Sequence, residues 1–461
     1  MMNYDILSLV IIMMNDTIVA ISTALGQGAI SIVRLSGEEA IDIVSKSFVG
    51  PDLKKVPSHT IHYGHIVQGD KPIDEVLISV FLAPKSFTTE TIVEIHCHGG
   101  VFVANKILEL MLINGARAAN PGEFTERAFL HGRIDLTQAE AVMDIIEAKS
   151  DMSLTLANKG LDGVIYQLIT SLRSDLLQII ANIEVNIDYP EYDDVIVLSN
   201  DILRPAIVAL NSRIKGIIEQ AHYGKLIRDG IKTAIIGRPN VGKSSILNAL
   251  LREDKAIVTE IQGTTRDIVE GRINIGGIIL NLIDTAGIRE SNDVVERIGI
   301  EKAKAVIDEA ELILFVLDNN QPLTDEDLAL LHLTKEKQRI VIINKSDLSK
   351  ELVHVFDNSV EVSALHKQGI DRLEAKIRDM FLSGNINLTD QTYVSNARHI
   401  AKLEATKLAL DDSISSIDNQ MPVDMVEIDL KSAWILLGDI IGDNSSDSLL
   451  DELFRKFCLG K

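Results

Sequence analysis

A glycine-rich stretch near the middle of the chain has the spacing of a triphosphate-binding loop. Residues Gly237 to Ser244 fit the pattern G-x-x-x-x-G-K-[ST]. An apolar run, Ile231 to Ile236, precedes this stretch, and a helix-like segment, Ser245 to Leu250, follows it, which is the context that the pattern requires. Backbone N–H groups of such a loop wrap the β-phosphate, while Lys243 can reach the β- and γ-phosphate oxygens and Ser244 can bind Mg²⁺. The sequence therefore predicts a nucleoside triphosphate site.

A second motif supplies magnesium and γ-phosphate contacts for such a site. Leu280 to Ile283 are typical of an apolar strand, and the strand ends in Asp284-Thr285-Ala286-Gly287. The Asp284 carboxylate can hold the Mg²⁺ shell, and the N–H of Gly287 can approach the γ-phosphate. We therefore expect this segment to lie beside the phosphate loop.

A third motif distinguishes guanine from adenine. The apolar run Ile340 to Ile343 leads into Asn344-Lys345-Ser346-Asp347. The Asp347 carboxylate can accept two N–H bonds from the guanine edge, whereas adenine presents the opposite pattern of donor and acceptor. The segment Glu361 to Leu365 is similar to the loop that lies under the base in TRAFAC-type translation-factor GTPases. The three motifs, in this order, predict a GTPase of that type.

Composition limits what surrounds the GTPase segment. The chain has 461 residues, which predicts roughly two to four domains. A net charge of −22 disfavours non-specific nucleic-acid binding over the whole surface, although it leaves room for a local basic patch or a basic partner. The two cysteines, Cys97 and Cys458, are far apart in sequence, and so few cysteines fit a reducing compartment. We therefore expect a cytoplasmic protein.

The first residues are apolar without the features of a targeting segment. The run Ile6 to Met14 is far shorter than the ~20 residues of a membrane span, and no Lys or Arg precedes it. We interpret residues 1–14 as a dispensable extension, with Met13 or Met14 as the alternative initiator. No other segment of the sequence predicts a membrane span.

The remaining patterns predict an α/β and α multidomain protein. Strand patterns occur within 17–33, 59–67, 76–82 and 91–98, with a helix-like stretch over 38–48. Thr137 to Glu140 form a capping-box pattern that predicts the start of a helix. Helical periodicity continues to about Tyr223 and returns after Gly384. The predicted domains are an N-terminal α/β domain over 15–132, a discontinuous helical domain over 133–227 and 385–461, and an inserted Ras-like P-loop GTPase domain over 228–384.

Segments outside the GTPase domain resemble those of the bacterial and mitochondrial tRNA-modification GTPases called MnmE or TrmE. The resemblance covers all three domains, and the C-terminal signature, with Cys fourth from the end, is its most specific part. The segments are Asn15 to Ala20, Val93 to Gly100, Pro121 to Leu130, Asp135 to Ala141 and Phe457 to Lys461.

The resemblance implies an activity, cofactors and partners. Together with an FAD-dependent partner, MnmG, the family installs a carboxymethylaminomethyl or aminomethyl group on C5 of the wobble uridine of certain tRNAs. The one-carbon unit comes from a tetrahydrofolate, in the 5-formyl or methylene form, and FAD is present only through the partner. The N-terminal domain is expected to bind this folate and to form a homodimer, and two MnmG-type subunits complete a heterotetramer.

Four positions match the folate contacts of the family, namely Arg34, Glu94, Arg133 and Lys461. Two cations can meet the glutamate carboxylates of folate, and Glu94 can accept bonds from the pterin N–H groups. Arg133 stands where the family can carry Lys, which changes the geometry of the contact.

Two cysteine-containing segments allow more than one interpretation. His96 and His98 share one face of a strand while Cys97 faces the other, so a structural role is favoured over metal binding. Cys458 is either a nucleophile, as the resemblance implies, or a small residue packed under the C-terminal helix.

Hydrolysis needs a water-positioning group, and the position after Gly287 holds Ile288, which has no donor or acceptor. The resemblance implies that Glu296 positions the water and is catalytic. It also implies that K⁺ takes the place of an arginine finger, held by Asn240 and by the loop of residues 259–264. The two GTPase domains of the dimer are then expected to meet in the triphosphate state.

The site residues predicted by these motifs and by the resemblance form three sets. The GTP contacts are Asn240, Val241, Gly242, Lys243, Ser244, Ser245, Thr259, Glu260, Ile261, Gln262, Gly263, Thr264, Thr265, Asp284, Thr285, Ala286, Gly287, Asn344, Lys345, Asp347, Ser363 and Ala364. The Mg²⁺ ligands are Ser244 and Thr265, and the K⁺ ligands are Asn240, Thr259, Ile261 and Thr264.

Two other functions share parts of this pattern. A regulatory GTPase whose flanking domains dock partners would carry the same nucleotide motifs, and only Glu94, Arg133 and the Cys458 segment discriminate against it. A folate-binding enzyme with a vestigial GTPase domain is disfavoured by the intact Lys243, Asp284 and Asp347.

Overall fold

The computed structural model describes residues 16–188, 200–251, 271–283, 298–382, 394–443 and 447–460. These residues form two compact units, one from residues up to 143 with those from 438 onward, and one from 144–437. None of the helices within the described ranges is long and apolar enough to cross a membrane. The proposed extension over 1–14 lies outside the described residues.

The first unit is built on a seven-stranded sheet with the order β3-β4-β5-β6-β2-β1-β7. All neighbouring strands are antiparallel except β1 and β7, which are parallel. The strands are β1 (Ile18–Ile21), β2 (Ile30–Ser36), β3 (Phe48–Val49), β4 (Thr60–Gln68), β5 (Lys71–Phe81), β6 (Ile92–His98) and β7 (Arg117–Ala118). Strands therefore occur in each region where the sequence predicted them.

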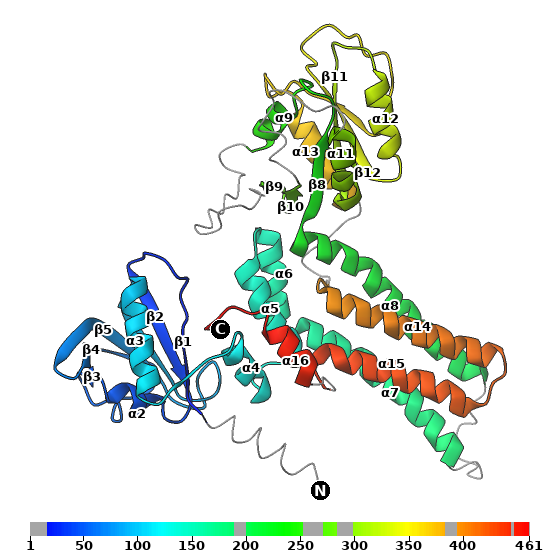
Figure 1. Ribbon diagram of the computed structural model, residues 1–461. Coiled ribbons are helices and arrows are strands. Elements are labelled where there is room, and N and C mark those ends of the chain that lie inside the picture. The colour runs from blue at the N-terminus through cyan, green and yellow to red at the C-terminus, as the bar shows by residue number, and fades with distance from the viewer. Residues whose placement is uncertain are drawn as a thin grey trace. The chain divides into compact units, whose positions relative to one another are not determined.

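Two helices cover one face of this sheet (Figure 1). They are α2 (Ala40–Ser45) and α3 (Val101–Ile113), and their buried residues pack against alternate residues of β1, β2 and β6. The predicted helix over 38–48 is shorter in the structure, because Phe48 joins strand β3 and pairs with Ile66 of β4. The strand's period of two places one face of each strand in this core and leaves the other face available.

The C-terminal segment packs in the first unit against two helices that follow the sheet. These are α4 (Glu123–Leu130) and α5, which begins at Leu136 and ends at Glu147. Phe454 of α16 (Asp447–Phe454) and Phe457 lie in one apolar cluster with Leu136, with Phe129 packed against it. Burial of these rings fixes the chain's last residues beside α4.

The start of α5 corrects the predicted capping box. The helix begins at Leu136, one residue before the predicted cap Thr137. The Asp135 carboxylate accepts the N–H groups of Thr137 and Gln138, at 2.8 and 3.1 Å, and the Gln138 side chain accepts the Asp135 N–H at 3.0 Å. Asp is a good N-cap, and here it forms the reciprocal pair that the sequence analysis assigned to Thr137 and Glu140.

Long helices and a second sheet make up the second unit. The helices outside the sheet region are α6 (Asp151–Leu161), α7 (Val164–Asp188), α8 (Asn200–Asp229), α14 (Ala397–Asp418) and α15 (Val423–Ile441). Helices α8 and α14 lie side by side (Figure 1) and are joined by the ion pair of Arg204 and Asp418 at 2.6 Å. The Arg173 guanidinium of α7 stacks on the Trp434 ring of α15 at 4.0 Å.

The second sheet has the order β13-β12-β11-β8-β10-β9, parallel except for the pair β10 and β9. Its strands are β8 (Ile231–Ile236), β9 (Arg272–Ile275), β10 (Ile278–Leu282), β11 (Leu312–Asp318), β12 (Gln338–Asn344) and β13 (Ser359–Glu361). The accompanying helices are α9 (Lys243–Leu250), α11 (Ile298–Glu309), α12 (Asp325–Leu333) and α13 (Ile370–Leu382). The strand order reverses direction at β8, and sheets of this class bind ligands beyond the carboxyl ends of the strands at such a point.

Candidate functional site

The predicted phosphate loop follows β8, at the carboxyl end of the central strands. Asn240 and Gly242 have positive φ angles of 64° and 97°, and α9 begins at Lys243. A Cβ at Gly242 would lie 2.1 Å from Asn344 Nδ2, so only glycine fits there. Alternating backbone conformations of this kind turn successive N–H groups toward one point, and the α9 N-terminus adds its positive end. The described residues therefore fit a phosphate group.

The lysine of the loop is held at the mouth of this anion site. Lys243 Nζ donates to the carbonyl oxygens of Gly237 and Arg238, both at 2.8 Å. Burial lowers the pKa of this ammonium, because the charged form loses hydration. A bound phosphate would stabilise the charged form of this lysine, in keeping with the predicted contact between Lys243 and the phosphate oxygens.

The loop is also anchored by a pair that the sequence analysis did not identify. Arg238 Nε lies 2.8 Å from Asp327, whose side chain is almost completely buried. Asp327 also accepts the N–H of Thr324, and these two residues cap α12. The capping pattern Thr324 to Asp327 is visible in the sequence, but its contact with the phosphate loop depends on the tertiary fold.

The structure brings the predicted base-binding segments against the phosphate loop. Asn344 Nδ2 donates to the Val241 carbonyl at 2.9 Å, and Asn344 Oδ1 accepts the Ala364 N–H at 3.1 Å. Asp347 accepts from the Ser363 hydroxyl at 2.5 Å, and this bond lowers the pKa of the Asp347 carboxyl. Asp347 is therefore held as a carboxylate, the form that accepts two guanine N–H bonds.

A buried aspartate, which the sequence analysis did not single out, positions the guanine motif. Asp318, at the end of β11, is nearly inaccessible and pairs with Lys345 Nζ at 2.7 Å. Lys345 itself has a φ of 61°, so the pair holds a turn of unusual backbone conformation. The sequence did contain one sign of this role, because Asp318 is an acidic residue at the end of an otherwise apolar strand, 312–318.

Several predicted nucleotide residues lie outside the described residues. They are Thr259, Glu260, Ile261, Gln262, Gly263, Thr264, Thr265, Asp284, Thr285, Ala286, Gly287 and Glu296.

Two of the predicted folate residues form a pair on the first sheet. Arg34 of β2 faces Glu94 of β6 in the strand register, and Arg34 Nε donates to Glu94 Oε1 at 2.8 Å. Arg34 Nη1 also donates to the Gly460 carbonyl at 3.3 Å, and the Ser22 hydroxyl donates to the same oxygen at 3.0 Å. The residue before Lys461 therefore lies at this pair, although Lys461 itself is outside the described residues.

Arg133 is connected to this pair through aromatic rings and not by a direct polar contact. Its guanidinium lies 5.0 Å from the centre of the Phe87 ring, and Phe87 packs against the cluster that contains Phe124. Arg34 in turn lies 5.7 Å from the centre of the Phe124 ring. Aromatic residues were not part of the predicted site, because only the fold brings them between the two arginines.

The two cysteines have opposite environments. Cys97 is buried, and desolvation raises the pKa of its thiol to about 11, which makes it a poor nucleophile. Cys458 is exposed, so it is not the packed residue of the alternative interpretation. In the described part of the chain no cluster of three metal-binding side chains is found; His96 contacts Ser79 and His98 contacts Asp74.

Comparisons with known proteins cover the whole of this architecture. A family model described as the GTP-binding protein TrmE N-terminus matches residues 17–133, and one described as the MnmE helical domain matches residues 136–458. A protein of Ligilactobacillus salivarius (strain UCC118) is 53% identical over 455 residues, which cover 97% of this chain and 98% of that protein. A protein of Bacillus mycoides (strain KBAB4) is 52% identical over 455 residues, which cover 97% and 99%.

Both of these relatives are described as tRNA modification GTPase MnmE. Among solved structures, Era of Aquifex aeolicus bound to GDP and AlF₄⁻ is 29% identical, with 39% of this chain and 66% of that chain covered and a TM-score of 0.25. The predicted fold class, with an α/β N-terminal part, a helical part and a P-loop GTPase part, is confirmed. The chain is a GTPase, and it belongs to the MnmE (TrmE) family of tRNA modification GTPases.

Proposed function

We propose that the chain is the K⁺-activated, GTP-hydrolysing component of a complex that modifies C5 of the wobble uridine of tRNA. The group installed is carboxymethylaminomethyl or aminomethyl, and its one-carbon unit comes from a tetrahydrofolate. The partner is an FAD protein of the MnmG type, which joins the homodimer of this chain in a heterotetramer. Family membership supports this proposal, and the placement of the C-terminal segment carries it furthest.

The observation that carries the proposal is the contact of Arg34 with both Glu94 and the Gly460 carbonyl. The Arg34 guanidinium thus contacts Glu94, a second predicted folate residue, and also Gly460, the last residue that the structure describes. The exposed Cys458 lies two residues from this contact, so the segment brings a thiol toward the predicted folate site. The alternative function, a regulatory GTPase whose flanking domains dock partners, does not require this contact.

A homodimer is supported by exposed apolar residues on β4 and β5, on the face of the first sheet opposite α2 and α3. Arg34 and Glu94 lie on the face opposite α2 and α3, because residues paired across strands share a face. On that same face Ile61, Tyr63 and Leu77 are 64%, 56% and 45% exposed. Exposed apolar side chains beside a site are typical of an interface, and we infer that a second copy covers them and completes the folate site.

In the GTPase part, the described residues bind and orient the nucleotide. The backbone of residues 240–244 receives the phosphates, Lys243 and Ser244 meet their oxygens and Mg²⁺, and Asp347 binds the base. Mg²⁺ neutralises phosphate charge when bound. Glu296 is the proposed water-positioning group, and Asn240 with residues 259–264 is the proposed K⁺ shell.

Hydrolysis is expected to depend on K⁺. Asn240 is exposed at the turn of the phosphate loop, where its side-chain oxygen can bind a cation. A cation there supplies the charge that an arginine finger would supply, so replacing K⁺ by Na⁺ at equal ionic strength should lower kcat about tenfold or more. Phosphate release measured in the two salts checks this. Asn240→Ala should remove the difference between them, and equal rates in the two salts for the unaltered chain would contradict K⁺ activation.

A further inference from the structure

A cavity of about 600 Å³ lies beside the Phe87 ring in the first unit. Two cationic side chains, Lys85 and Arg133, line it together with the rings of Phe81 and Phe87. Positive charge next to aromatic faces suits an anionic ligand that carries flat rings. The pterin, benzoyl and glutamate groups of a tetrahydrofolate have these properties.

One wall of this cavity is the short segment of residues 85–89, which has no regular secondary structure. Arg133 donates to the Phe87 carbonyl at 2.5 Å, and the His131 ring contacts the Thr88 carbonyl at 2.6 Å. The Thr88 side chain is completely buried, and its hydroxyl contacts that of Ser36 at 2.7 Å. Arg133 and His131 thus hold the wall from within the cavity lining, whereas the buried Thr88 and Ser36 hold it from the protein interior.

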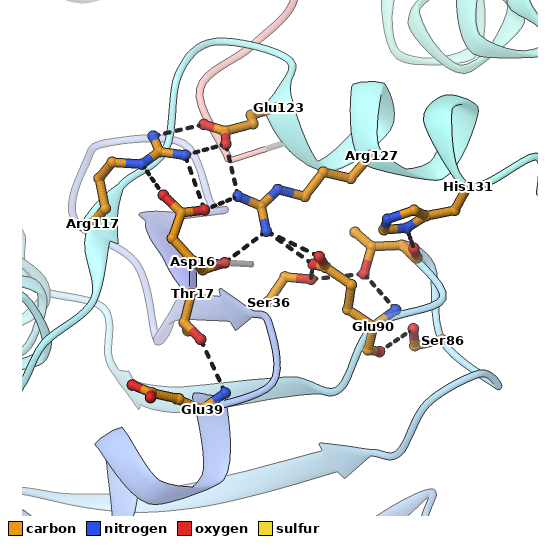
Figure 2. A network of polar contacts seen from close by, with 11 residues as sticks. Asp16, Thr17, Ser36, Glu39, Ser86, Glu90, Arg117, Glu123, Arg127 and His131 are labelled. Carbon is orange, nitrogen blue, oxygen red and sulfur yellow. Dashed lines mark hydrogen bonds and ion pairs between the residues drawn. The ribbon is translucent and has the colours of Figure 1, made fainter. Parts of the chain in front are cut away.

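A charged anchor, Glu90, follows the wall directly (Figure 2). Its carboxylate accepts from Arg127 Nη1 at 3.0 and 3.2 Å and from the Ser36 hydroxyl at 2.6 Å. Its main-chain N–H and carbonyl bond to Thr88 and Ser86. Glu90 is thus tied both to the wall and to helix α4.

Arg127 is the buried centre of an ionic cluster in which two arginines meet three carboxylates (Figure 2). Only 4% of Arg127 is exposed. Besides Glu90 it contacts Glu123, at 3.0 Å, and Asp16, whose carbonyl lies at 2.9 Å. Arg117 contacts Asp16 and Glu123 on the far side from the wall.

Glu90 and Glu123 are chemically alike in this cluster but differ in what they hold. Both are carboxylates on Arg127, with side-chain exposures of 12% and 8%. Glu90 continues into the cavity wall, whereas Glu123 lies on α4 itself and contacts the Asn120 N–H and Arg117. Arg127 therefore pairs with one carboxylate that is joined to the cavity wall, Glu90, and with one that is not, Glu123.

We propose that Glu90, held by Arg127, is a positioning residue that sets the wall of residues 85–89, so that the cavity binds the tetrahydrofolate. This inference rests on the proposed function of the chain. It adds the cavity lined by Lys85 and Arg133 to the predicted folate contacts. It also gives the ionic cluster around Arg127 a role in ligand binding. Phe87 contacts both the cavity and the Phe124 cluster that leads to Arg34.

The test compares Glu90→Gln with Glu123→Gln in the full chain. Each change replaces one carboxylate that pairs with Arg127 by a neutral side chain of the same shape. Breaking a buried ion pair in this way destabilises the protein. Both variants should therefore unfold at lower temperature than the unaltered chain. Only Glu90→Gln should weaken the binding of 5-formyltetrahydrofolate, by about tenfold in Kd, while Glu123→Gln stays within about twofold.

Isothermal titration of the three proteins with 5-formyltetrahydrofolate, below their unfolding temperatures, provides the measurement. Ser36→Ala, which removes the hydroxyl that contacts both Glu90 and Thr88, should weaken binding in the same direction by about threefold. Equal Kd values for Glu90→Gln and the unaltered chain, or equal weakening in Glu90→Gln and Glu123→Gln, would overturn the positioning role. Absence of binding to the unaltered chain would instead overturn the proposed folate function, and this inference with it.

Discussion

Replacing Asp347 with Asn is expected to change the preferred nucleotide from GTP to xanthosine triphosphate. The carboxylate accepts two N–H bonds from guanine, whereas an amide offers one acceptor and one donor. The Ser363 hydroxyl fixes one oxygen of Asp347 at 2.5 Å, so the side chain cannot turn away to relieve the mismatch. Each hydrogen bond to a charged group contributes about 1.5–3 kcal/mol, so GTP should bind about ten- to a hundredfold more weakly.

Competition between the two triphosphates for the variant and the unaltered chain measures this change. Glu361→Gln is a matched control, because Glu361 is a nearby carboxylate that is paired with Lys350 at 3.0 Å and is not a predicted base contact. The control should keep its preference for GTP. An Asp347→Asn variant that still selects GTP would show that another residue recognises the base.

Deleting residues Phe457 to Lys461 is expected to abolish tRNA modification while leaving GTP hydrolysis within about twofold of the unaltered rate. These residues lie outside every nucleotide motif. Phe457 is buried against Phe454, and the Gly460 carbonyl accepts bonds from Arg34 and Ser22. The deletion removes the thiol of Cys458 and also the contact that holds the segment at the predicted folate site.

Two single substitutions separate these effects. Cys458→Ser keeps the packing and removes only the thiol, because the side chain is exposed. Gly460→Ala keeps the thiol but displaces the segment, since Gly460 has a φ of +86° and an added Cβ would lie 2.5 Å from the Ile21 carbonyl. Both should lose modification and retain hydrolysis, as judged by nucleoside mass spectrometry and phosphate release on the same preparations. Normal modification by the truncated chain would exclude the C-terminal segment from the site.

The nucleotide site could be predicted from sequence because its residues are local in the chain. Gly237 to Ser244 and Asn344 to Asp347 each contain the backbone turn and the side chain that the chemistry needs. The contact between the two motifs, from Asn344 to the Val241 carbonyl, follows from their position at the ends of parallel strands. Asp318 escaped notice because its partner Lys345 lies in the turn after another strand, β12, 27 residues further along the chain.

The first unit was harder to predict, because its site depends on long-range pairing. The resemblance to a family named Arg34 and Glu94, but their direct contact follows only from the register of β2 and β6. The cluster around Arg127 joins segments that are far apart in the sequence, and no periodic pattern predicts it. The capping error at Thr137 arose because Asp135 is an equally good cap two residues earlier.

The most direct test of the proposed function is nucleoside mass spectrometry of tRNA from bacteria that lack their own MnmE relative and express this chain instead. We expect the C5-modified wobble uridine to return with the unaltered chain. It should stay absent with Lys243→Ala, which removes the cation at the predicted phosphate site. Full expression of the unaltered chain with unmodified wobble uridine would contradict a role in tRNA modification.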